Sequence, residues 1–408
     1  MVRSVAPVLL GGTDRGPTGE HVQGRQGPGR RPGAWLRAVM ALASALALLL
    51  VVAGCSGGDD GDHGDDGSPP TTAERGRRSA DEGAGDRPAG EDVGDQGGID
   101  GPYPVGLLAL DLVDTSRPTR AAPGLPGGAP DRALPVDVLY PATGEAPGAT
   151  TIQTPDDTAE TTGGTAGDAV TPIEGAEPAP GRFPLVELAH GTDATKEDMR
   201  RLAAVLARAG YVVAVPTFPL SRAGVGEAGD YVNQPADMSF VLDQVLARGS
   251  EGATGPLSGH VDGDHVAVAG HALGAATVYG LSYNSCCLDE RVDATIGISG
   301  GGLLFPGGDY EGAPATPLLV VLGARDATVP TYVGDNSFAT AQPPAYYLLL
   351  EGADHTSLLD AGTDGDADLL VAAAVAFLDA QLKAAPAGLD AIGERIEAGG
   401  GGEWRSKA

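Results

Sequence analysis

Residues 266–276 constrain the fold of this chain more than any other segment. They read Val-Ala-Val-Ala-Gly-His-Ala-Leu-Gly-Ala-Ala, an apolar run followed at once by a turn between two glycines. A continuous apolar run bounded by turn residues is typical of a strand that is buried on both faces. The small residues Gly274, Ala275 and Ala276 would let a following helix pack closely on that strand. The segment therefore predicts a strand, a sharp turn and a helix at the centre of a parallel sheet.

Strand and helix patterns alternate on both sides of this segment. Such an alternation predicts an α/β domain with a mostly parallel sheet that is covered by helices on both faces. We expect strands at 105–113, 134–140, 183–189, 211–215, 266–269, 294–298, 318–322 and 346–350, and helices at 195–209, 235–247 and 369–382.

Composition divides the rest of the chain. Glycine (64 residues) and proline (32 residues) are concentrated outside the periodic segments, which indicates disorder there. We expect a signal peptide with a long basic start at 1–54, a disordered acidic linker at 55–100, the α/β domain at 101–383 and a flexible tail at 384–408. A low-complexity insertion at 143–181 is expected to form a surface excursion between two strands.

The start of the chain predicts export. Arg30, Arg31 and Arg37 precede an apolar run at 41–54, and Val-Ala-Gly stands directly before Cys55. This pattern is typical of a secretory signal and is similar to a bacterial lipobox, in which the cysteine is lipidated. The expected location is the cell membrane, with the chain lipid-anchored through Cys55 on its extracytoplasmic face. The alternative is an ordinary transmembrane helix, for which the run is short.

The charge of the chain argues against a nucleic-acid partner, and its cysteines do not predict a metal site. The net charge is −29, with 55 Asp and Glu against 26 Lys and Arg, so no nucleic-acid partner is expected. Cys286 and Cys287 are adjacent and form either two buried thiols, the interpretation we favour, or a vicinal disulfide. No spacing of ligands predicts a metal or a cofactor.

Residues with catalytic chemistry follow four of the predicted strands. They are the turn at Ala272, the loop His190-Gly191-Thr192-Asp193, Asp326 and His355. Functional residues gather at the carboxyl ends of the strands in open α/β sheets. Asp354 is an alternative to Asp326 as the acid, and Ser299 is the only nearby serine that is a plausible substitute nucleophile.

The segment from Pro102 to Leu382 resembles bacterial esterases of the α/β-hydrolase superfamily. The resemblance is closest to those related to platelet-activating-factor acetylhydrolases, dienelactone hydrolases and cutinase-like polyester hydrolases. The similar segments include Leu134-Pro-Val-Asp-Val-Leu-Tyr-Pro141, Leu188-Ala-His-Gly191, Gly270-His271 and Arg291-Val-Asp-Ala294.

The resemblance implies hydrolysis of a small ester or lipid. Asp326 and His355 would be the acid and the base. The oxyanion and binding groups would come from Gly191, Thr192, Leu273 and His271. The short segment between Gly300 and Thr316 predicts no large cap over an open pocket.

Ala272 departs from this family pattern, because it occupies the position of the nucleophilic serine in Gly-x-Ser-x-Gly. A methyl group cannot attack a carbonyl carbon. We therefore expect an inactive or weakened enzyme, and the alternative is a non-catalytic surface protein that uses the retained pocket for binding.

Overall fold

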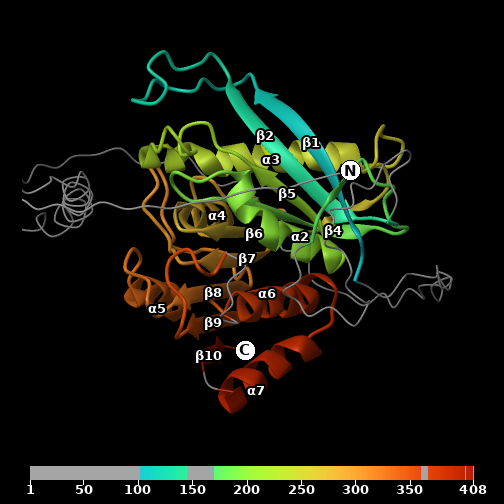
Figure 1. The fold of residues 1–408 in the computed structure, drawn as a ribbon. Helices are drawn as coiled ribbons and strands as arrows, with labels where there is room; N and C mark the ends of the chain where they lie inside the picture. The colour runs from blue at the N-terminus through green and yellow to red at the C-terminus, as the bar shows by residue number, and fades with distance from the viewer. Residues whose placement is uncertain (1–101, 145–169, 360–365, 400, 408) are drawn as a thin grey trace, which may run out of the picture. The chain divides into compact units, whose positions relative to one another are not determined.

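The computed structural model of the protein describes residues 102–144, 170–359, 366–399 and 401–407. These residues form a ten-stranded sheet in the order β3-β1-β2-β5-β4-β6-β7-β8-β9-β10 (Figure 1). The strands are β1 (Val105–Asp114), β2 (Arg132–Pro141), β3 (Ile173–Glu174), β4 (Phe183–Ala189), β5 (Val212–Pro216), β6 (Val261–His271), β7 (Val292–Ile298), β8 (Leu318–Gly323), β9 (Ala345–Leu350) and β10 (Gly402–Lys407).

The central part of the sheet is parallel throughout. The strands from β5 through β4, β6, β7 and β8 to β9 all run in one direction. The second strand, β2, is antiparallel to both of its neighbours, β1 and β5. The predicted α/β fold with its mostly parallel sheet is confirmed.

Helices cover both faces of this sheet because side chains alternate along each strand. In β4, Val186 and Leu188 face the core beneath α2 and α6, whereas Leu185 and Ala189 face the core beneath α3 and α4. The helices are η1 (Lys196–Met199), α2 (Arg200–Arg208), η2 (Ala228–Asn233), α3 (Gln234–Gly249), α4 (Leu273–Tyr283), α5 (Thr331–Thr340), α6 (Asp366–Leu382) and α7 (Ala387–Gly399).

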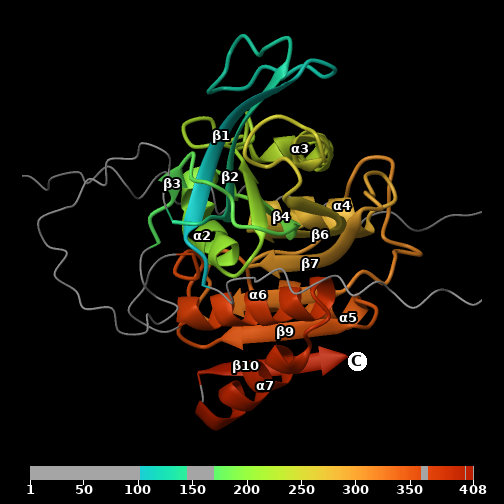
Figure 2. The same ribbon diagram turned by 90° about the vertical axis from the view of Figure 1, so that its right-hand side faces the viewer.

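The C-terminal residues are not a flexible tail, so the prediction for 384–408 is wrong. Figure 2 shows α7 and β10 beyond β9, at the end of the sheet. The helix buries Leu389, Ile392 and Ile396 against the main core, and β10 pairs with β9 along its whole length. Among the glycines that suggested flexibility, Gly399 ends α7, Gly402 begins β10, and Gly401 precedes β10 with φ = 95°. Apolar burial therefore holds this segment on the domain.

The predicted excursion at 143–181 also returns to the fold. Its last residues form β3, which pairs with β1, and bury Ala176 and Ala179. The Tyr140 hydroxyl donates to the carbonyl oxygen of Ala176 at 2.7 Å. Residues 145–169 of the excursion lie outside the described residues, and so do the predicted signal peptide, Cys55 and the linker.

Two further observations concern the described residues. The segment 299–317 between β7 and β8 contains no helix or strand, as expected for a domain with no large cap. Within the same described ranges, no helix is long and apolar enough to cross a membrane.

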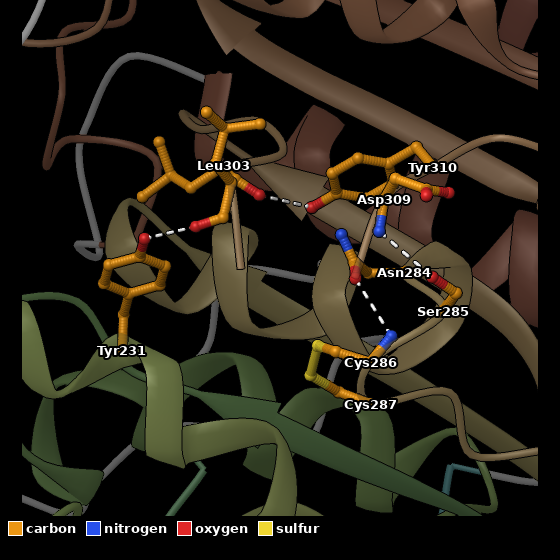
Figure 3. The surroundings of a disulfide bond; sticks show 9 residues. Tyr231, Asn284, Ser285, Cys286, Cys287, Leu303, Asp309 and Tyr310 are labelled. Carbon is orange, nitrogen blue, oxygen red and sulfur yellow. Dashed lines mark hydrogen bonds between the residues drawn. A yellow bond between two sulfur atoms is a disulfide. The ribbon is translucent and has the colours of Figure 1, made fainter. Parts of the chain in front are cut away.

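Cys286 and Cys287 form a vicinal disulfide directly after α4 (Figure 3). Cys286 is exposed and Cys287 is half-buried, so the favoured interpretation of two buried thiols is wrong. The Asn284 side chain accepts a hydrogen bond from the Cys286 N–H at 3.1 Å. The hydroxyl of Ser285 accepts one from the Asp309 N–H at 3.0 Å, which links the disulfide turn to the segment between β7 and β8.

Candidate active site

The turn between β6 and α4 has the geometry that its glycines require. A Cβ atom at Gly270 would lie 2.1 Å from the Gly274 carbonyl oxygen, and one at Gly274 would lie 2.1 Å from the Ala189 carbonyl oxygen. No real side chain tolerates such contacts with backbone. The two glycines therefore allow the helix to start directly on top of the strand end, which leaves Ala272 partly exposed at the bend.

Ala272 has a backbone conformation that alanine rarely adopts. Its φ is 54° and its ψ is −113°, and its N–H donates to the Ile298 carbonyl oxygen at 3.0 Å. Such a conformation costs about 1–3 kcal/mol and is concentrated at functional sites. The strained bend that would present a serine hydroxyl is thus present, but the Cβ atom of Ala272 carries no oxygen.

His355 and Asp326 come together across the ends of β9 and β8. The Nδ1 atom of His355 lies 2.8 Å from Oδ2 of Asp326, whose side chain is fully buried. The other carboxylate oxygen accepts hydrogen bonds from the N–H groups of Thr328 and Val329, both at 2.8 Å. Because the carboxylate can only accept, Nδ1 carries a proton and Nε2 is the nitrogen left to act as a base.

The alternative acid, Asp354, points elsewhere. One of its oxygens accepts hydrogen bonds from the N–H groups of Ser357 and Thr356 at 2.9 and 3.0 Å. These backbone bonds lower the pKa of the Asp354 carboxyl. Asp354 therefore caps a turn, and the carboxylate that contacts the imidazole of His355 is that of Asp326.

The alternative nucleophile, Ser299, is inaccessible. It follows β7 with φ = 47°, but it is fully buried, and its hydroxyl makes no hydrogen bond to any described residue. A substrate cannot reach a hydroxyl with no exposed surface. The structure therefore supplies no replacement for the missing serine at this position.

The loop at 190–193 lies against the bend. A Cβ atom on Gly191 would lie 3.1 Å from the Cβ atom of Ala272. Gly191 is buried and Thr192 is exposed, whereas the Asp193 N–H donates to the Ser221 carbonyl oxygen at 2.7 Å. Leu273 opens α4, so its N–H has no acceptor within the helix. The two expected sources of oxyanion donors therefore lie on either side of Ala272.

His190 holds this loop in place as a neutral imidazole. Its Nε2 accepts a hydrogen bond from the Phe218 N–H at 3.0 Å, and so its Nδ1–H donates to the Gly191 carbonyl oxygen at 2.8 Å. Burial lowers the pKa of His190. This role could not be predicted from residue patterns, because Phe218 lies 28 residues further along the chain.

His271 is likewise neutral, and it supports His355 rather than the oxyanion side. Its Nε2–H donates to the His355 carbonyl oxygen at 2.7 Å, and the two ring centroids are 4.8 Å apart. Burial lowers the pKa of His271 to about 4. The expected binding residue is thus a positioning residue for the loop that carries the base.

This arrangement contains a base, an oriented acid and two candidate oxyanion donors, but no nucleophile at the bend. Across the described part of the chain, no group of three His, Cys, Asp or Glu side chains is placed to bind a metal ion. The chemistry that the side chains themselves support is deprotonation next to a polarised carbonyl group.

Comparison with known proteins gives little sequence similarity. No family model and no curated protein matches the chain. Among solved structures, the ferulic acid esterase from Streptomyces cinnamoneus is similar, with a TM-score of 0.49 and 21% identity. The match covers 70% of this chain and 92% of that one.

Proposed function

We propose that this protein is a disabled carboxylic ester hydrolase that keeps the scaffold for ester or lipid cleavage. The observation that carries the proposal is the Asp326–His355 hydrogen bond at 2.8 Å in a fold whose strained bend presents Ala272. The acid, the base and the bend occupy the positions of a hydrolytic triad, and only the nucleophilic oxygen is missing.

The missing oxygen removes one route of catalysis. In the covalent route, the imidazole takes a proton from serine, and the serine oxygen attacks the ester carbonyl carbon. With Ala272 no acyl intermediate forms, so the remaining contribution is carbonyl polarisation by the N–H groups near Gly191 and Leu273. Such residual effects give about 10³-fold acceleration over water in proteases that lack their nucleophile.

Restoring serine tests the proposal. We expect Ala272→Ser to raise turnover of p-nitrophenyl acetate by about 10³-fold or more over the native chain. The full chain is used, because truncation at residue 383 would remove β10 from the sheet. Steady-state release of p-nitrophenol measures both proteins.

The control is the double variant Ala272→Ser, His355→Ala. It removes the base from the restored site and should return turnover to the native level. High native activity that depends on His355 would show that Ala272 is not disabling, and no gain in the serine variant would show that the rest of the site is not competent.

A non-catalytic surface protein that binds an ester or lipid is the second candidate. It is favoured by the strained backbone at Ala272, which stability alone does not require. Binding without turnover by the native chain supports it.

We also propose that the protein is exported and lipid-anchored through Cys55. The sequence before Cys55 supports this, and so does the Cys286–Cys287 disulfide, since disulfides persist in oxidising compartments outside the cytosol. We expect cells fed radiolabelled palmitate to label the chain, and the Cys55→Ser variant to lose that label. Equal labelling of both would remove this part of the proposal.

A further inference from the structure

The disulfide between Cys286 and Cys287 closes no long loop of the chain, because the two residues are adjacent. A disulfide stabilises a fold mainly by joining distant residues and so restricting the unfolded chain, and this effect is smallest for the shortest loop. The bond therefore adds little to the free energy of unfolding. A disulfide of this kind is suited to reversible chemistry when a thiol can reach it.

The disulfide is accessible in the folded chain. Cys286 is exposed and Cys287 is half-buried. Both line a surface cavity of about 660 Å³ that is bordered by α3, the end of β1 and the segment after β7. Thiol–disulfide exchange requires that a thiolate approach one of the two sulfur atoms. Cys286 meets this requirement without any unfolding of the domain.

The turn that contains the disulfide packs directly on Gly308. An added Cβ atom at Gly308 would lie 2.4 Å from the Cys286 nitrogen and 2.6 Å from the Cys286 Cβ atom. The Cys286 N–H donates to the Asn284 side chain, and the Cys287 N–H donates to the Asn284 carbonyl oxygen, both at 3.1 Å. Since no space separates Cys286 from Gly308, a shift of one displaces the other.

Two hydrogen bonds join the same turn to segment 302–313 (Figure 3). The Ser285 N–H donates to the Asp309 carbonyl oxygen at 2.9 Å, and the Asp309 N–H donates to the Ser285 hydroxyl at 3.0 Å. Ser285 directly precedes Cys286 in the chain. The backbone conformation of the disulfide turn therefore determines whether Asp309 keeps both partners.

Segment 302–313 lies next to the candidate active site. An added Cβ atom at Gly300, just before it, would lie 2.5 Å from the Ala272 carbonyl oxygen. The Tyr310 hydroxyl donates to the Leu303 carbonyl oxygen at 2.8 Å (Figure 3). Because this described segment contains no helix or strand, contacts of this kind hold it in place, and loss of a few of them is sufficient to loosen it.

We propose that the Cys286–Cys287 disulfide is an exchange site for a dithiol reductant and that its reduction loosens segment 302–313. A thiolate of the reductant attacks the Cys286 sulfur, which forms a mixed disulfide and releases the Cys287 thiolate. The second thiolate of the reductant then attacks its own sulfur in the mixed disulfide and releases the Cys286 thiolate. The protein gains two electrons and takes up two protons, and the reductant leaves as a disulfide.

Reduction changes the turn because bonded sulfur atoms lie much closer together than unbonded ones. At least one cysteine side chain must move when the bond breaks, and Gly308 leaves Cys286 no room on its side. The movement is therefore expected to displace Ser285 or Gly308 and to break the hydrogen bonds to Asp309. The site requires no nucleophile at position 272, so it stands whether or not the proposed function is correct.

Labelling of thiols tests the exchange site. The full chain with Cys55→Ser retains only Cys286 and Cys287, so every label reports on this pair. Iodoacetamide should add no label before treatment and two after dithiothreitol without denaturant, within about one hour, as measured by intact mass. The unfolding midpoint should fall by no more than about 4 °C on reduction. Labelling without reductant, or only in denaturant, would overturn the proposal.

Hydrogen exchange measured by mass spectrometry tests the coupling. Peptides that cover residues 302–313 should exchange about five- to tenfold faster in the reduced chain, as expected for the loss of one or two hydrogen bonds. Peptides from α6, which does not contact the disulfide turn, should exchange at the same rate in both states. Unchanged exchange at 302–313, or an equal increase in α6, would overturn the proposal.

Two variants separate the disulfide from the reagent. The double variant Cys286→Ser, Cys287→Ser should show the fast exchange at 302–313 without dithiothreitol and should not respond to it. Ser285→Ala keeps the disulfide and removes the acceptor of the Asp309 N–H, so it should take two labels after reduction and exchange faster at 302–313 before it. Slow exchange in the double-serine variant would overturn the proposal.

Discussion

At the scale of single residues, the site depends on two histidines that are kept neutral by burial. His271 is 6% exposed, and its Nε2–H supports the backbone of His355. Below its unfolded pKa of 6.5, the unfolded chain binds a proton that the folded chain does not accept until the pH falls to about 4. The free energy of unfolding therefore decreases as the pH falls through this window.

This linkage predicts a difference between the native chain and His271→Gln, which cannot bind that proton. Between pH 7 and pH 4.5 the native chain should lose about 2 kcal/mol more unfolding free energy than the variant. Urea denaturation at the two pH values measures this difference. Equal losses in both proteins would mean that His271 binds its proton as readily in the fold as in the unfolded chain.

The sequence predicted Ala272, Asp326 and His355 because each directly follows an apolar strand, and parallel strands end at the same edge. It could not predict the roles of His190 and His271. Those depend on the Phe218 N–H and the His355 carbonyl oxygen, which only the tertiary fold brings near. The pattern of side chains along a sequence does not show which distant backbone groups will bond to them.

At the scale of elements, β4 contains a glutamate, Glu187, among residues whose pattern predicts only apolar core side chains. Glu187 is fully buried, and neither carboxylate oxygen forms a hydrogen bond to any residue the structure describes. Burial, followed by the negative charge of Asp289, raises the pKa of Glu187 well above its usual value. The folded chain therefore holds a proton here that the unfolded chain releases above about pH 4.5, and stability decreases as the pH rises.

Glu187→Gln removes this titration while keeping the shape of the side chain. We expect the variant to have a higher urea midpoint than the native chain at pH 8 and nearly the same midpoint at pH 4. Midpoints measured across this range provide the check, and a parallel pH dependence in the two proteins would contradict it.

The sequence predicted eight strands of the sheet and three long helices but missed α5. Apart from Ala339, that helix contains only residues of low helix propensity, Gly334 and Asn336 among them, so its local pattern is weak. Packing explains its position, because a Cβ atom at Gly334 would lie 2.2 Å from the Leu322 side chain in β8. Contact with the sheet, rather than propensity, stabilises this helix.

At the scale of the whole described domain, the sheet ends in a strand that comes last in the chain. Arg405 of β10 lies over the Tyr347 ring at 3.6 Å from its centroid and pairs with Asp335 of α5 at 2.5 Å. Removal of residues 384–408 would leave the outer edge of β9 unpaired and uncover apolar surface beneath α7. An unpaired edge strand is a template for association between chains.

We therefore expect a chain that stops after Lys383 to aggregate and to unfold at a lower temperature than the native chain. Light scattering and thermal denaturation measure both effects. Deletion of residues 1–100 is the matched control, because it removes none of the described residues. A soluble and equally stable truncated chain would show that α7 and β10 do not contribute to the domain.

The position of β10 also has a consequence for biosynthesis. A ribosome makes a chain from its N-terminus towards its C-terminus, so β9 emerges before residues 402–407 do. Until those residues have emerged, β9 cannot acquire its antiparallel partner. This edge of the nascent domain therefore closes after the parallel centre of the sheet is already available to fold.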